Sequence, residues 1–155
     1  MATTRRSAGL LLFRHGDAGV EVLIGHMGGP FWARKNERAW SVPKGEHPPD
    51  EEPWAAARRE FAEETGLPVP AGQPVPLGTV RQSGGKEVTV WAVEGDLDAA
   101  AAVSNTFSLE WPRGSGTIQE FPELDRFAWA DVDTARRLLV AGQTAFLDRL
   151  VEHLG

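Results

Sequence analysis

The sequence predicts an α/β (α+β) fold, an α/β/α sandwich in which a mixed β-sheet lies between helices. Strand-like segments occur on both sides of one central helical stretch, and two further helical stretches follow near the C-terminus. The 155 residues suit one hydrophobic core, and a content of 41% hydrophobic and 25% charged residues is typical of a globular protein. No repeat or domain boundary is visible, so we expect a single domain over residues 1–155.

The N-terminal third is expected to form a β-hairpin, a loop and a short strand. After a frayed tail at residues 1–6, two apolar runs of strand length flank the turn His15-Gly16-Asp17. Residues 27–38 (MGGPFWARKNER) are rich in glycine and charge and predict a long loop, which either covers the core with its aromatic residues or contacts a substrate. The strands are expected at 7–13, 20–25 and 39–43.

The central helix is expected at residues 53–65. Its buried face is predicted by apolar residues at helical spacing, namely Trp54, Ala57 and Phe61. Asp50 or Glu51 is expected to cap the first turn, where a proline is also well tolerated. Gly66 supplies the left-handed residue that commonly ends a helix.

The second half of the chain is predicted to add strands and then helices. Two strand-like segments flank the glycine-rich stretch Ser83-Gly84-Gly85-Lys86, which predicts a second hairpin. Residues 96–102 fit no single element, and residues 104–116 are expected to be irregular. The strands are expected at 77–82, 87–94, 119–123 and 126–130, and the helices at 131–140 and 143–154.

The composition excludes several classes of function. The chain has no cysteine, which rules out disulfides, zinc–thiolate sites and cysteine nucleophiles. Its formal net charge of −6 argues against stable nucleic-acid binding, which needs a basic surface. The N-terminal apolar run is too short for a signal peptide and no run could span a bilayer, so we expect a cytoplasmic protein without a membrane partner. Nothing in the sequence indicates an oligomeric state.

Acidic residues lie close together on the central helix. Because an α-helix advances about 100° per residue, Glu63 and Glu64 flank Glu60 one turn further on. Adjacent carboxylates repel one another, so the cluster contributes little to a purely structural helix. Mg²⁺ and Mn²⁺ prefer hard oxygen ligands and are commonly held by carboxylates together with substrate phosphates. The cluster therefore predicts a metal-dependent enzyme that acts on a phosphorylated substrate.

Residues 45–67 resemble the Nudix box, Gly-x5-Glu-x7-Arg-Glu-U-x-Glu-Glu-x-Gly-U, in which U is a bulky apolar residue. Its defined positions are occupied by Gly45, Glu51, Arg59, Glu60, Phe61, Glu63, Glu64, Gly66 and Leu67. The chain is thus similar to the Nudix (MutT-like) hydrolases, which use Mg²⁺ or Mn²⁺ to hydrolyse a diphosphate linked to another moiety, usually a nucleoside. The resemblance implies a Nudix-type α/β/α sandwich and a small-molecule substrate, either an NTP or a dinucleoside polyphosphate.

The resemblance also implies roles for residues of the box. The residues that correspond to the metal-binding acids are Glu60, Glu63 and Glu64. A backbone carbonyl of Lys44 or Gly45 is expected to complete the metal coordination. Arg59 is expected to pair with Glu51 and so to orient the acids.

The box leaves the general base open, because its position differs between branches of the family. It is either a glutamate of the box, such as Glu60 or Glu63, or an acid from a later loop. Among the later acids, Glu120 is preferred over Glu123 as the base or as a distal metal ligand.

Further residues are candidates for binding the substrate. Lys44 belongs to a Pro-Lys-Gly run that resembles family members acting on highly phosphorylated substrates. The other candidates for contacts with phosphate or base are Trp32, Arg34, Arg81, Lys86, Phe107, Trp111 and Arg113. The downstream tyrosine of many dinucleoside tetraphosphate hydrolases is absent, and Gln82 stands where ADP-ribose members carry proline. These absences leave the choice of substrate open. Hydrolysis of ADP-ribose or a nucleotide sugar is kept as an alternative, and so is a non-catalytic nucleotide-binding regulator.

Overall fold

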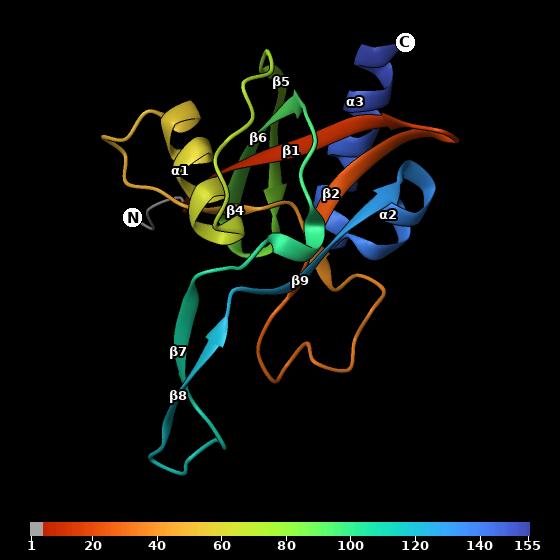
Figure 1. Cartoon of the computed structure of the whole chain (residues 1–155). Helices are drawn as coiled ribbons and strands as arrows, with labels where there is room; N and C mark the ends of the chain where they lie inside the picture. The colour runs from red at the N-terminus through yellow and green to blue at the C-terminus, as the bar shows by residue number, and fades with distance from the viewer. Residues whose placement is uncertain (1–4) are drawn as a thin grey trace.

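A computed structural model describes residues 5–155, which form one mixed sheet with helices on both of its faces and a separate two-stranded hairpin (Figure 1). Of the tail expected at 1–6, residues 1–4 lie outside the described part, and Arg6 already begins the first strand. The strands are β1 (Arg6–Gly16), β2 (Gly19–Met27), β3 (Trp40–Ser41), β4 (Lys44–Glu46), β5 (Val75–Gln82), β6 (Lys86–Glu94), β7 (Thr106–Glu110), β8 (Ile118–Pro122) and β9 (Leu124–Asp131). The α-helices are α1 (Pro53–Thr65), α2 (Val132–Leu138) and α3 (Thr144–Leu154), and 3₁₀ turns occur at Ser83–Gly85, Ala99–Ala101 and Ala141–Gln143.

Strand β1 is the centre of the sheet, whose order is β3-β2-β1-β6-β5. The C-terminal part of β1 pairs antiparallel with β2, with Phe13 opposite Val22, while its N-terminal part pairs antiparallel with β4. Its other edge pairs with β6 in parallel, with Ser7 opposite Val88. Strand β9 is added antiparallel to β2. Because the two halves of one edge of β1 meet different strands, β4, which contains the first residues of the box, is built directly into the sheet.

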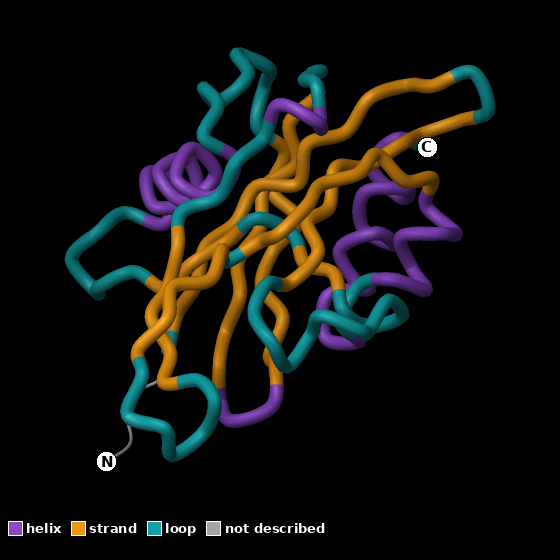
Figure 2. Tube along the Cα trace, turned by 60° about the horizontal axis from the view of Figure 1, so that its bottom comes forward, coloured by secondary structure: helices purple, strands orange, loops and turns teal. Residues whose placement is uncertain are grey.

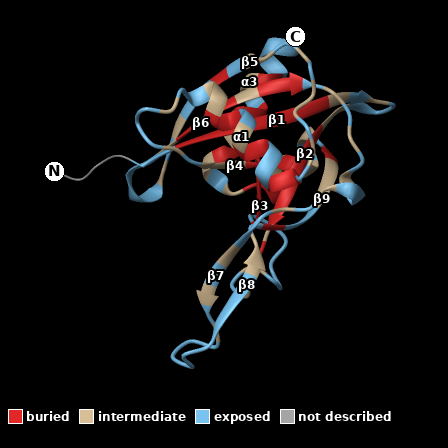
Figure 3. Cartoon of the chain, turned by 60° about the vertical axis from the view of Figure 1, so that its left-hand side comes forward, coloured by how far each residue is buried: buried red, intermediate tan, exposed pale blue. Residues whose placement is uncertain are grey.

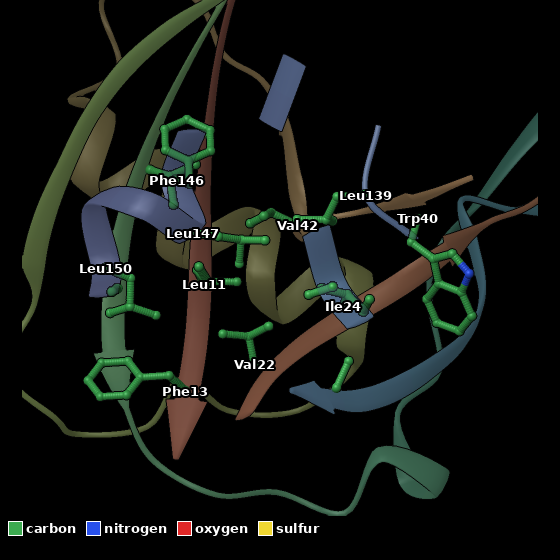
Figure 4. Close-up of a cluster of buried hydrophobic side chains, with 14 of the residues drawn as sticks. Leu11, Phe13, Val22, Ile24, Trp40, Val42, Leu139, Phe146, Leu147 and Leu150 are labelled. Carbon is green, nitrogen blue, oxygen red and sulfur yellow. The ribbon is translucent and has the colours of Figure 1, made fainter. Parts of the chain in front are cut away.

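Alternating residues of β1 serve two separate cores. Leu10 and Leu12 pack with Phe61 of α1 on one face of the sheet. Leu11 and Phe13 belong to the larger core on the other face, which includes side chains of α2 and α3 (Figure 4). Buried residues therefore follow the strands through the middle of the molecule (Figure 3). This arrangement confirms the predicted fold class, a mixed sheet between helices.

Helix α1 has the predicted bounds but a different N-cap. Glu52, rather than Asp50 or Glu51, accepts hydrogen bonds from the backbone N–H groups of residues 54 and 55. Glu51 is engaged elsewhere, because both of its carboxylate oxygens bind Arg59. At the other end Gly66 has φ 68° and donates its N–H to Ala62, as expected for a left-handed C-cap.

The largest departure from the sequence-based expectation is the β7–β8 hairpin, which replaces the irregular segment predicted at 104–116. The five residues TFSLE of β7 alternate strictly between exposed and half-buried side chains, which is the period of a strand. The hairpin forms a sheet of its own and projects from the body of the molecule on the same side as the 27–38 loop (Figures 1 and 2). The predicted strand at 119–123 is thus its second strand, shifted by one residue.

Helix α2 is shorter than the predicted helix at 131–140. Asp131 caps it by accepting the N–H of Thr134. The helix ends at Leu138 because Leu139 is extended and forms a parallel bridge with Trp40. None of the helices over residues 5–155 combines the length and the apolar character needed to cross a bilayer.

Candidate active site

The acidic face of α1 lies against the backbone of β4. Glu60 and Glu64 are buried, with 8% and 7% of their surfaces exposed, while Glu63 is exposed. The backbone N–H of Lys44 donates to Glu64 Oε2 at 3.2 Å. Gly45 stands so close to the Glu60 carboxylate that a Cβ atom at this position would overlap it. The glycine that opens the box therefore leaves the space that the Glu60 carboxylate occupies beside β4.

Arg59 organises the carboxylates of the box. Its Nε and Nη2 atoms bind the two oxygens of Glu51 at 2.9 and 2.8 Å, a bidentate pair. Its Nη1 atom donates to Glu60 Oε1 at 2.8 Å and to Glu63 Oε1 at 3.2 Å. The guanidinium thus offsets the repulsion between these three acids, and its shortest hydrogen bonds hold Glu51 and Glu60 in place.

A cavity of about 350 Å³ lies beside these acids. Its walls come from the starts of β1 and β6, the end of β2, the segment β3–β4, helix α1 and the residues around the β7–β8 hairpin. The lining residues are Ser7, Met27, Ser41, Lys44, Gly45, Glu46, Glu60, Glu63, Glu64, Lys86, Asn105, Glu123 and Leu124. Carboxylates and lysines therefore face the same space, which suits a complex of a cation with phosphate groups.

Burial makes the acids of the cavity harder to ionise. It raises the pKa of Glu64 to about 8, although the charge and the backbone N–H of Lys44 act in the opposite direction. Burial also raises the pKa of Glu60 and of Glu123, against the lowering effects of Arg59 and Lys44 respectively. By contrast, hydrogen bonds from Arg59 lower the pKa of Glu51. A divalent cation would favour the ionised forms that burial disfavours.

The donor set fits Mg²⁺ or Mn²⁺, although the acids are not arranged as a finished metal cage. Within residues 5–155, no three acidic or histidine side chains converge as ligands of one ion. The Nη1 atom of Arg59 already binds an oxygen of Glu60 and one of Glu63. The buried carboxylates and the close backbone of Lys44 and Gly45 nevertheless offer only hard oxygen ligands, as these cations require.

The two candidates for a distal acid are placed differently. Glu120 is exposed on β8, opposite Ser108 on the outer side of the hairpin, and does not line the cavity. Glu123 follows the hairpin and does line it. Its backbone is held by two hydrogen bonds, from its N–H to Asn105 and from Gly28 to its carbonyl. The geometry therefore reverses the order of preference and favours Glu123.

An irregularity between β2 and β9 brings Glu123 to the cavity. Met27 pairs with Leu124 and His26 with Arg126, so Asp125 is an extra residue in β9. The fully buried His26 lies 2.9 Å from Asp125 Oδ1 through Nδ1 and 2.6 Å from the carbonyl oxygen of Lys35 through Nε2. This histidine ties the 27–38 loop to the start of β9, a role that nothing in the sequence indicates.

The predicted substrate-binding residues fall into three groups. Lys44 and Lys86 line the cavity. A second group lies on or beside the β7–β8 hairpin and comprises Phe107, Trp111 and Arg113. The remaining residues belong to neither group: Trp32 packs against the larger core, Arg34 is exposed in its loop, and Arg81 pairs with Glu87 at 3.5 Å. Of the two interpretations of the 27–38 loop, Trp32 therefore fits the one in which an aromatic residue of the loop covers the core.

Sequence reasoning missed several residues that line the cavity, namely Ser7, Met27, Ser41, Glu46, Asn105 and Leu124. Ser41 had one usable signal, since it is a polar residue between the buried Trp40 and Val42. Its hydroxyl oxygen accepts a hydrogen bond from the buried Gln143, whose Oε1 also accepts the N–H of Val42. Gln143 thereby links the N-terminus of α3 to the strand segment that leads to Lys44.

Solved structures of other proteins have a similar fold. The structure of an Ap4A hydrolase from C. elegans in a binary complex superposes with a TM-score of 0.67 at 21% identity, covering 96% of this chain and 97% of that one. The NUDIX domain of Shewanella oneidensis NrtR, complexed with ADP ribose, gives a TM-score of 0.68 at 17% identity, covering 100% and 91%. RenU, a Nudix hydrolase from M. smegmatis, gives 0.58 at 23% identity, covering 99% and 88%. These similarities establish the fold.

A search among curated proteins gives no match. The family model of the NUDIX domain, however, matches residues 3–151, almost the whole chain. The chain therefore belongs to the NUDIX domain family, and the assignment to the Nudix hydrolases that was predicted from residues 45–67 is confirmed.

Proposed function

We propose that this protein is a divalent-metal-dependent pyrophosphohydrolase that cleaves a diphosphate linkage in a nucleoside polyphosphate. The observation that carries the proposal is the cavity itself, in which the box glutamates and Glu123 face Lys44 and Lys86. A polyphosphate needs cations around it, and buried carboxylates need a cation among them. A metal–polyphosphate complex satisfies both requirements at once.

In this proposal Glu60 and Glu64 would hold Mg²⁺ or Mn²⁺, with the backbone of Lys44 and Gly45 beside them. A divalent ion at this position neutralises phosphate charge and promotes ionisation of water. Arg59 keeps the carboxylates aimed through its bonds to Glu51 and Glu60. Carboxylates that are already held in place lower the barrier of the reaction, because they do not have to reorganise when the substrate binds.

The remaining residues of the cavity would bind phosphate and move a proton. Lys44 and Lys86 both line the cavity and supply positive charge, from β4 and from the start of β6. Glu123 is the proposed general base, because it lines the cavity, where burial raises its pKa above the ordinary value. A carboxylate tuned in this way contributes about 10²–10⁴-fold by taking the proton of the attacking water.

A substrate panel tests the proposed function. The purified chain is incubated with Mg²⁺ or Mn²⁺ and NTPs, dinucleoside polyphosphates, ADP-ribose or nucleotide sugars, and products are resolved by chromatography. ADP-ribose belongs in the panel because the NUDIX domain of NrtR was crystallised with it. We expect metal-dependent cleavage, with nucleoside polyphosphates preferred. Preference for ADP-ribose would support the second enzymatic alternative, and tight binding without turnover would support a regulator.

Replacing Gly45 by alanine is expected to lower kcat by about 10²-fold on any substrate found in the panel. The added Cβ would overlap the Glu60 carboxylate and push it away from β4. Gly16→Ala is the matched control, because it lies at the far end of β1 and the atoms nearest to its Cβ would belong to the carboxylate end of Glu21, outside the box. Steady-state kinetics and thermal unfolding of both variants separate the catalytic effect from loss of fold. Equal kcat values in the two variants would contradict the role of Gly45.

A further inference from the structure

An aromatic cluster outside the cavity is made by two segments that are far apart in the sequence. Phe31 of the 27–38 loop meets Trp111, at the end of the β7–β8 hairpin, edge to face with ring centroids 5.4 Å apart. The guanidinium carbon of Arg113 lies 5.8 Å from the centroid of the Phe31 ring. Figure 1 shows the loop and the hairpin extending from the same side of the sheet.

This cluster, Phe31, Trp111 and Arg113, is connected to the cavity by one face of the hairpin. Asn105 lines the cavity, and along β7 the alternate residues Phe107 and Leu109 are half-buried on the side that leads to Trp111. Trp111 lies six positions after Asn105 along extended chain, a span of about 20 Å. An apolar path therefore runs from the phosphate-sized cavity to the aromatic cluster.

The loop is fastened along this path. The N–H of Gly28 binds the carbonyl oxygen of Glu123, and Gly29 comes so close to the Phe107 ring that a side chain there would be crowded. These contacts place Phe31 over the hairpin and do not bury it.

The cluster has the properties of a binding surface more than of a core. Phe31 is 49% exposed, whereas its neighbour Trp32 packs into the larger core. Arg113 is also exposed, and no carboxylate among residues 5–155 lies within ion-pair distance of it. An exposed ring beside a planar cation is the combination on which nucleobases stack.

We propose that Phe31 and Trp111, with Arg113 beside them, form a second binding site, which takes the nucleobase at the end of the polyphosphate remote from the acidic cavity. The proposal rests on the proposed function, since the phosphates are assigned to that cavity. The span of about 20 Å along β7 suits a long ligand, a polyphosphate with a nucleoside at each end, and we assign the cluster to the second of these nucleosides.

Calorimetry with non-hydrolysable analogues tests this assignment. Methylene-bridged analogues of ATP and of diadenosine tetraphosphate are titrated with Mg²⁺ into the wild type, Phe31→Ala and Trp111→Ala. We expect the dinucleoside analogue to bind the wild type at least about tenfold more tightly than the ATP analogue does. This ratio corresponds to the lower part of the range of affinity gained by stacking one base on an aromatic side chain. Each variant should lose this advantage while keeping its affinity for the ATP analogue. Because the two residues lie on different segments, a local folding defect in one variant cannot explain both losses.

Ile118→Ala is the matched control, because Ile118 is 65% exposed on the outer side of the same hairpin, opposite Glu110. It should retain the wild-type ratio of affinities. Equal affinities for the two analogues in the wild type, or a ratio that neither Phe31→Ala nor Trp111→Ala changes, would overturn the second site and leave the proposed function standing. Binding of neither analogue would remove the proposed function as well.

Discussion

Replacing Glu60 by glutamine is expected to lower kcat by about 10³-fold, equivalent to about 4 kcal/mol of transition-state stabilisation. Glutamine has nearly the same shape as glutamate but carries no charge, so the site loses a metal ligand without losing volume. The carboxylate of Glu60 is buried, bound by Arg59 and close to the backbone of Gly45, so a neutral side chain there removes a charge from the wall of the cavity. Kinetics on the best substrate of the panel, at saturating metal, measures the effect.

Two comparisons make this result specific. Glu152→Gln removes one exposed carboxylate from α3 and should leave kcat unchanged. Because burial already favours the neutral form of Glu60, the amide should fold as well as the acid, and thermal unfolding should confirm this. If Glu60→Gln keeps kcat within about twofold of the wild type, Glu60 is not a metal ligand in the transition state.

The box helix could be predicted from the sequence because its determinants are local. The apolar residues at helical spacing, the glycine that ends the helix and the pairing of Arg59 with Glu51 all lie within residues 45–67. Each needs only the geometry of one helix and its adjoining loop. The predicted N-cap was wrong, because local sequence allows Glu51 either to cap the helix or to bind Arg59. In the structure Glu51 binds Arg59, and Glu52 caps the helix.

The distal part of the site could not be predicted, because it depends on pairing between distant strands. Lys86 reaches the cavity through the parallel alignment of β6 with β1, which brings its neighbour Glu87 opposite Arg6. Glu120 and Glu123 are only three positions apart, and no local pattern distinguishes them. The register of β7 with β8 turns Glu120 outward, while the extra residue Asp125 directs Glu123 to the cavity.

The metal-free protein is expected to lose stability as pH rises from about 4.5 to about 8. Burial raises the pKa of Glu64 from its ordinary 4.5 to about 8, so between these values the folded state holds a proton that the unfolded chain has released. Stability falls with pH wherever the folded state binds more protons. The contribution is fully present below pH 4.5 and is lost by about pH 8, a difference of roughly 3–5 kcal/mol for Glu64.

Urea unfolding between pH 5 and pH 9 measures this dependence, with and without saturating Mn²⁺. Glu64→Gln should flatten most of the slope, because the amide cannot titrate, and the raised pKa values of Glu60 and Glu123 should account for what remains. Bound Mn²⁺ should also reduce the slope, since it stabilises the ionised carboxylates, and its affinity should therefore rise with pH up to about 8. A slope that is identical in the wild type and in Glu64→Gln would show that the proton belongs to another group. In that case the charge of Lys44, together with its backbone N–H, which donates to Glu64 Oε2 at 3.2 Å, would be sufficient to keep Glu64 ionised.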